Sequence, residues 1–131
     1  MQAIVQSAYG IDPDAVLRIA EVPRPAIQPG EVLVEVAAAS VDRGTWHLMT
    51  GRPRLMRLLG FGFRRPKAPN PGRAFAGTIV SAGSSVTEFR PGDEVYGTCD
   101  GSFAEYAAVE VSKIARKPTN LSFAQAAAVP V

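Results

Sequence analysis

The sequence contains one histidine and one cysteine, two side chains that often carry acid–base or nucleophilic chemistry near neutral pH. His47 is the only histidine among the 131 residues, and an imidazole can donate or accept a proton near neutral pH. A lone histidine is also commonly a surface or packing residue. Cys99 is the only cysteine, so counting alone excludes an intrachain disulfide and a cysteine-rich zinc site. Its surroundings, Gly-Thr-Cys-Asp-Gly at 97–101, are turn-like and lack a histidine, so we interpret the thiol as structural and not as a nucleophile.

Positive charge is concentrated in one part of the chain. Between Arg43 and Thr87 there are eight Arg or Lys residues and no Asp or Glu, and six of the eight lie in residues 52–67. Such a loop can attract an anion, a phosphate or an acidic protein surface. It can equally be solvated, or form a lid whose leucine and phenylalanine side chains pack down. Nucleic-acid binding is disfavoured, because the sequence has neither a recognition-helix pattern nor an aromatic stacking platform.

A single small domain has to position these groups. A chain of 131 residues suits one hydrophobic core, and its 12 glycines and 11 prolines indicate short strands joined by many turns. No apolar run approaches the roughly 20 residues of a membrane span. Residues 1–10 also lack the basic head and apolar core of a signal peptide. We therefore expect a soluble, cytoplasmic protein that has no membrane partner.

Alternating apolar and polar residues between turn signals predict seven short strands. They lie at 1–6, 16–22, 31–39, 75–82, 94–97, 102–109 and 113–117. Gly77 lies inside the fourth strand and predicts a bulge or a close backbone approach. A short helix is predicted to begin at Asp42, an N-cap residue, and to end at Gly51, and Ser122 is predicted to cap a helix over 123–128. The spacing favours a mainly β fold, a partly open barrel that is antiparallel or nearly so.

Six short motifs occur in a specific order along nearly the whole chain. They are Pro-Gly-Glu-Val-Leu-Val at 29–34, Ala-Ser-Val-Asp at 39–42, Pro-Gly-Arg-Ala-Phe-Ala-Gly-Thr-Ile at 71–79, Phe-Arg-Pro-Gly-Asp-Glu-Val-Tyr-Gly at 89–97, Gly-Ser-Phe-Ala-Glu-Tyr at 101–106 and Leu-Ser-Phe-Ala-Gln-Ala-Ala at 121–127. Each motif is weak alone. Together they resemble the N-terminal, GroES-like (alcohol dehydrogenase-like) catalytic domain of the medium-chain dehydrogenase/reductase superfamily, in its zinc-independent quinone oxidoreductase branch. Such motifs identify the scaffold and not the reaction.

The branch is assigned by residue types at the positions of the zinc ligands. The zinc-dependent branch would have a cysteine near Asp42 and a His-Glu pair at Arg73 and Ala74. Neither arginine nor alanine binds zinc, and a lone carboxylate does not hold it. The four cysteines of the family's structural zinc lobe are also missing from the sequence. We therefore expect no zinc site.

The resemblance implies hydride transfer between a nicotinamide cofactor, usually NADPH and alternatively NADH, and a quinone, enone or related carbonyl or alcohol substrate. The reaction cleft would lie between the catalytic domain, residues 1–131, and a Rossmann domain expected after Val131 in a longer, homodimeric protein. The chain itself has no Gly-x-Gly-x-x-Gly after a strand, since the nearest sequence, at 60–65, lacks the third glycine. NADPH is therefore expected to bind mainly to the further domain, and these 131 residues are expected to be inactive alone.

Carried over by position, the resemblance assigns candidate site residues. His47 and Thr45 would be catalytic, with His47 donating a proton to a developing enolate or alkoxide. Asp42, Trp46 and Pro130 would contact the cofactor, although the family often has asparagine in place of Asp42. Three of these residues also have a structural interpretation. Asp42 can be a helix N-cap, Thr45 can form a hydrogen bond within its helix, and Trp46 can be a core anchor.

Two alternatives to an enzyme are open. The first is a non-catalytic binding module that uses the basic loop, residues 52–67, to hold an anionic or protein partner. The second is a co-chaperonin of the same barrel shape, which is disfavoured because the match would be one of shape alone.

Overall fold

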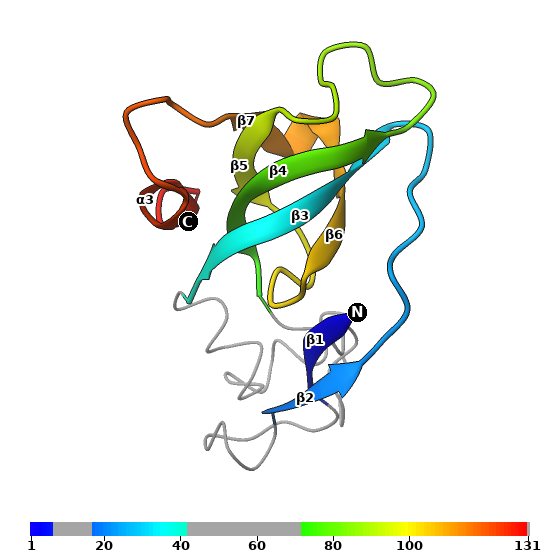
Figure 1. Cartoon of the computed structure of the whole chain (residues 1–131), viewed down its shortest axis with the longest axis vertical. Helices are drawn as coiled ribbons and strands as arrows, with labels where there is room; N and C mark the ends of the chain where they lie inside the picture. The colour runs from blue at the N-terminus through cyan, green and yellow to red at the C-terminus, as the bar shows by residue number, and fades with distance from the viewer. Residues whose placement is uncertain (7–16, 42–71, 131) are drawn as a thin grey trace, which may run out of the picture.

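The computed structural model of the protein describes residues 1–6, 17–41 and 72–130 (Figure 1). In these ranges the chain forms β1 (Gln2–Gln6), β2 (Leu17–Glu21), β3 (Glu31–Ser40), β4 (Ala74–Ala82), β5 (Glu94–Thr98), β6 (Tyr106–Glu110), the 3-10 helix η2 (Val111–Lys113), β7 (Ile114–Arg116) and α3 (Phe123–Ala127). All seven predicted strands are confirmed, and so is the helix after Ser122. The helix predicted to begin at Asp42 lies outside the described residues.

Five strands form one antiparallel sheet in the order β6-β3-β4-β5-β7, and β1 pairs with β2 in a separate antiparallel sheet. Figure 1 shows β3 and β4 crossing the middle of the molecule, with β1 and β2 below them. A bridge between Ala3 and Ala104, with a 2.8 Å hydrogen bond from Ile4 N to Phe103 O, joins the small sheet to the segment before β6. Neither sheet closes on itself, so the predicted mainly β, partly open barrel is confirmed.

Several predicted boundaries differ from the structure by one residue, and one differs by four. The sixth strand was expected to begin at residue 102, but β6 begins at Tyr106. Residues 102–104 make other contacts: Ser102 N donates to Gly72 O at 3.3 Å, and Ala104 bridges to Ala3. These partners are distant in sequence, so the local alternation of residues does not reveal them.

Gly77 marks a close approach between β3 and β4, as the sequence predicts. It pairs with Val36, next to a shift in strand register between Val36 and Ala38. A β-carbon at this position would overlap the carbonyl oxygen of Glu35 and lie 2.8 Å from Val34 Cγ1. Because glycine has no β-carbon, the two backbones can approach at this point.

Successive side chains of a strand point to opposite sides. The first residues of β4 are buried on both of these sides. Phe75 and Ile79 enter the main core, whereas Ala76 faces α3 and packs against Ala126 and Ala127. The buried members of the main core are Val32, Val34, Phe75, Ile79, Phe89, Val95, Cys99, Ala107 and Val109. The burial pattern therefore gives β4 a central position between the barrel core and the helix. Among the described residues, no helix is long and apolar enough to cross a membrane.

Candidate functional site

The structure describes only one of the five predicted site residues. Pro130 is half-buried and follows the end of α3. Asp42, Thr45, Trp46 and His47 lie outside the described residues, as does the basic loop at 52–67. Their roles stay predictions.

The described residues nevertheless locate both ends of the segment that carries the predicted catalytic side chains. Ser40, at the end of β3, pairs with Ala74, at the start of β4, so the chain leaves and re-enters the sheet at neighbouring positions. Helix α3 contacts β3, β4 and β5, and Ala38 packs against its buried alanines. In Figure 1, α3 and the C-terminal end of the described chain lie beside this end of β3. Helix α3, which Pro130 follows, thus packs on the two strands that flank the segment 42–71.

A tight backbone contact supports the start of β4. Gly72 has φ +102°, which favours glycine, and its carbonyl oxygen accepts hydrogen bonds from Gly101 N at 3.0 Å and Ser102 N at 3.3 Å. Arg73 O accepts a 2.8 Å hydrogen bond from Cys99 N. The Ser102 hydroxyl is buried against Gly72 and has no hydrogen-bond partner among the described residues. Sequence reasoning missed Ser102, because only the folded chain brings it to Gly72.

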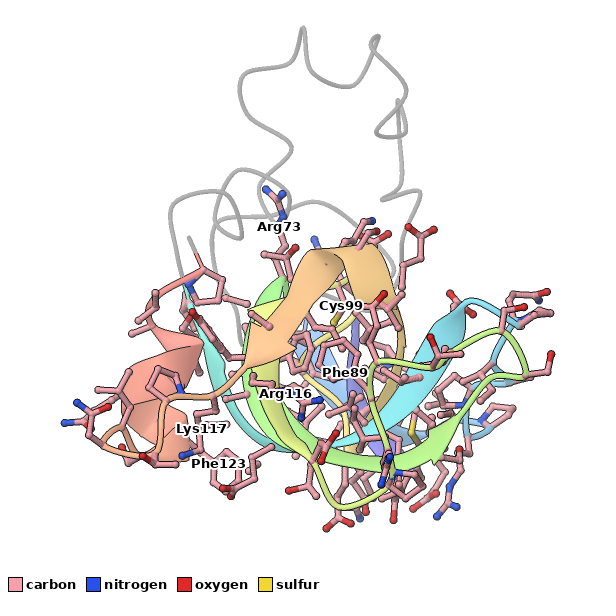
Figure 2. The ribbon with its side chains drawn as sticks, turned by 90° about the horizontal axis from the view of Figure 1, so that it is seen from above. Arg73, Phe89, Cys99, Arg116, Lys117 and Phe123 are labelled. Carbon is pink, nitrogen blue, oxygen red and sulfur yellow. The ribbon has the colours of Figure 1, made fainter. Side chains whose placement is uncertain are left out.

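The two positions that would hold zinc in the related branch have different environments. Ala74 is completely buried, and Arg73 is exposed, with its side chain projecting away from the barrel (Figure 2). Within residues 1–6, 17–41 and 72–130, no three His, Cys, Asp or Glu side chains are grouped so that they could hold a metal ion. The expectation that zinc is not used continues to rest on the residue types at positions 73 and 74.

Cys99 belongs to the hydrophobic core, where its residue is 7% exposed. Burial raises the pKa of this thiol to about 12, and the negative charge of Asp100 acts in the same direction. A thiol with so high a pKa is almost entirely protonated at neutral pH and is a poor nucleophile. This environment agrees with the structural role interpreted from the sequence.

The described residues do not make a complete dinucleotide site. The turns at 84–85 and 91–92 lie between the antiparallel strands β4 and β5, and the turn at 29–30 lies between β2 and β3. A dinucleotide-binding turn instead leads from a strand into a helix. Helix α3 has five residues and follows the turn at 118–121. Of the predicted cofactor contacts, the structure describes Pro130 alone, and its role stays a prediction. The described residues therefore contain no strand-turn-helix unit of the dinucleotide-binding kind.

Comparison with known proteins identifies the family. Residues 28–119 match the alcohol dehydrogenase GroES-like domain, so the chain belongs to that family. This match covers β3 to β7, the five strands of the main sheet. The resemblance to the quinone oxidoreductase branch of the medium-chain dehydrogenase/reductase superfamily is confirmed.

Curated relatives include two plant chloroplast enzymes. The chain is 36% identical over 138 residues to a quinone-oxidoreductase homolog from Spinacia oleracea, with all of this chain and 39% of that protein covered. It is 33% identical over 144 residues to an NADPH-dependent alkenal/one oxidoreductase from Arabidopsis thaliana, with all of this chain and 34% of that protein covered. The chain thus spans between a third and two fifths of the length of these relatives.

Solved structures agree with the sequence relatives. The quinone oxidoreductase of Coxiella burnetii superposes with a TM-score of 0.84 and 28% identity, over 99% of this chain and 41% of that one. Escherichia coli quinone oxidoreductase complexed with NADPH superposes with a TM-score of 0.81 and 25% identity, over 98% of this chain and 37% of that one. The domain therefore has the architecture of the corresponding part of these enzymes.

Proposed function

We propose that this chain is the catalytic domain of a zinc-independent, NADPH-dependent oxidoreductase that acts on quinones, enones or related carbonyl compounds. The main support is the 36% identity to a quinone-oxidoreductase homolog along the entire chain. Arg73 and Ala74, which cannot bind zinc, support the zinc-independent assignment.

In this proposal some residues supply a proton or a hydrogen bond, and others position the cofactor. Bound NADPH supplies the hydride. His47 holds the proton that neutralises the negative oxygen formed as the hydride adds, and Thr45 donates a hydrogen bond to the same oxygen. Asp42, Trp46 and Pro130 contact the nicotinamide end of the cofactor. Pro130 has no backbone N–H, so its contribution is a fixed apolar surface at the exit from α3.

The remainder of the cofactor site belongs, in this proposal, to a Rossmann domain that follows residue 131 in a longer protein. The coverage of the relatives supports this division, because this chain accounts for only 39% and 34% of their lengths. The longer protein is proposed to be a cytoplasmic homodimer.

A domain exchange tests the proposal. This chain replaces the superposed portion of Coxiella burnetii quinone oxidoreductase, and the unchanged enzyme is the positive control. NADPH binding is followed by nicotinamide fluorescence, and NADPH oxidation is measured with a panel of quinones and enones. We expect no NADPH binding by the 131-residue chain alone and turnover by the exchanged enzyme. His47→Gln should lower kcat by about 100-fold or more.

The main competing function predicts a different result. A non-catalytic module that uses the basic loop at 52–67 would give an exchanged protein that folds and binds NADPH but oxidises it with none of the substrates. That result would refute the oxidoreductase proposal. It would favour a binding function for the eight Arg and Lys residues between positions 43 and 87.

A further inference from the structure

The ammonium group of Lys117 is buried between β5, the turn at 118–121 and the start of α3. Its side chain is 6% exposed. Lys117 Nζ donates to Leu121 O at 2.7 Å and to Pro118 O at 3.3 Å. It lies 3.9 Å from Glu94 Oε1 and 5.2 Å from the centre of the Phe123 ring, which Figure 2 shows beside it. Carbonyl oxygens, a carboxylate and an aromatic ring therefore surround the charge.

The backbone of Lys117 is fixed independently of its side chain. Its N–H donates a 2.9 Å hydrogen bond to Glu94 O, so the residue stays attached to the start of β5 immediately after β7 ends. The ammonium group reaches four residues onward to Leu121, which directly precedes the N-cap Ser122. Lys117 thereby connects the rigid sheet to the point at which α3 begins.

Helix α3 depends on such attachments because it has only five residues. Isolated helices shorter than about 12 residues are marginal in water. A capping box stabilises its start, with Ser122 Oγ accepting from Gln125 N at 3.1 Å and Gln125 Oε1 accepting from Ser122 N at 2.9 Å. Ala126 and Ala127 are fully buried against the sheet. Three features thus hold α3: the capping box, the packing of Ala126 and Ala127 on the sheet, and the hydrogen bond from Lys117 Nζ to Leu121 O.

The same hydrogen bonds extend beyond α3 to the chain exit. Ala128 N donates to Gln125 O and Val129 N donates to Ala126 O, each at 3.2 Å. Pro130 follows these residues directly and is itself half-buried. A short hydrogen-bonded segment that includes α3 thus connects Leu121 to the residue before Pro130.

We propose that Lys117 is a positioning residue for the nicotinamide cofactor, which it affects by holding α3 and Pro130 in place. This inference rests on the proposed function, in which Pro130 contacts the cofactor. In this proposal Lys117 acts through its contacts with Leu121 and Pro118 and not through contact with cofactor or substrate. Its substitution should therefore weaken cofactor binding more than it slows the chemical step.

The first test uses the 131-residue chain and amide hydrogen exchange. Lys117→Met keeps a similar apolar volume, removes the charge, and leaves the carbonyls of Leu121 and Pro118 without their donor. Exchange should accelerate by about 10-fold or more at the amides of residues 125–129, while amides of the central strand β4 change little. Lys113→Met is the matched control, because it removes the same charge from an exposed side chain on η2. Exchange at 125–129 that is equal in both variants would overturn the proposal.

The second test separates positioning from a general structural role. In the exchanged Coxiella enzyme, Lys117→Met should raise the KM for NADPH by about 10-fold and change kcat by less than about twofold. Lys117→Arg, which keeps the charge and the donors, should recover part of this loss, and Lys113→Met should match the unmodified exchanged enzyme. If Lys117→Met instead lowered kcat by about 10-fold and left the KM for NADPH unchanged, the result would contradict the proposal.

A milder variant covers the case in which Lys117→Met does not fold. Phe123→Leu removes the ring beside the ammonium group and part of the packing that holds α3, and it should raise the KM for NADPH by about two- to threefold. An unchanged KM in this variant would count against Lys117 as a positioning residue. Different results refute the two proposals. The proposed function is refuted if the domain-exchange enzyme without further substitutions shows no turnover. The role of Lys117 is refuted if Lys117→Met leaves amide hydrogen exchange at residues 125–129 unchanged.

Discussion

Alanine substitutions at three glycines would measure how closely β3 and β4 approach. At Gly77 the new β-carbon would overlap Glu35 O, which belongs to the backbone of the neighbouring strand. At Gly92 it would meet nothing within 4 Å, but the residue has φ +97°. At Gly30 it would also meet nothing within 4 Å, and φ lies outside the left-handed region. The series therefore compares a variant with steric overlap (Gly77→Ala), one with backbone strain (Gly92→Ala) and one with neither effect (Gly30→Ala).

The structure sets the expected order of stability. Overpacking costs about 1–3 kcal/mol, and Gly77→Ala should fall near the upper value because its obstacle is a hydrogen-bonded backbone and not a mobile side chain. For a domain of this size, about 3 kcal/mol corresponds to a Tm lower by about 10 °C. Gly92→Ala should cost about 1 kcal/mol, or about 4 °C, for holding a left-handed residue with a side chain. Gly30→Ala should leave Tm unchanged or raise it slightly, because alanine reduces the entropy of the unfolded chain.

Thermal unfolding followed by circular dichroism gives the three Tm values. Urea titration provides a check, because a change in stability without a change in the m-value shows that only the folded state was affected. Gly77→Ala with a Tm within about 2 °C of that of Gly30→Ala would refute the reasoning, since β3 and β4 would then have room for a β-carbon.

Three further predictions concern single side chains. Burial raises the pKa of Cys99 to about 12, so at pH 8 the folded protein should react with a disulfide reagent at least about 100-fold more slowly than the unfolded chain; equal rates would contradict this. The hydrogen bond from Arg90 N, at 2.9 Å, and then Arg116, at 3.0 Å, lower the pKa of Asp93. Its stabilisation is therefore present above the unfolded pKa of about 4 and lost as pH falls, so the Tm difference between wild type and Asp93→Asn should close below about pH 4. A constant difference would be inconsistent with that linkage. Ser122→Ala should destabilise the start of α3 by about 1 kcal/mol, seen as faster exchange of the Gln125 amide, and unchanged exchange would exclude a role for the cap.

Local sequence signals predicted much of the fold. Alternation around exposed Glu35, between buried Val34 and half-buried Val36, located β3. The glycine inside β4 predicted a close approach, because a strand residue without a side chain permits one. Ser122, followed three residues later by Gln125, is the pattern of a capping box, and the structure contains both of its hydrogen bonds.

Contacts between distant residues were less accessible from sequence. Ser102 and Ala104 fit a strand pattern, but Gly72 and Ala3 engage them before β6 begins. Lys117 precedes a proline in an ordinary polar segment, and its burial depends on how β5, the following turn and α3 pack together. The predicted catalytic residues Thr45 and His47 lie outside the described ranges, so their assignment still rests on the family resemblance.

The pairing of β3 with β4 also requires the closure of a long loop during folding. Val32 pairs with Ala82 and Ser40 with Ala74, so the two central strands meet only when the chain closes over residues 41–73. The edge strands β6 and β7 pair with β3 and β5 respectively. Because the entropy of closing a long loop is lost before those contacts form, this topology has a high contact order. Its folding time should therefore fall in the range of milliseconds to seconds that is typical of β-rich domains.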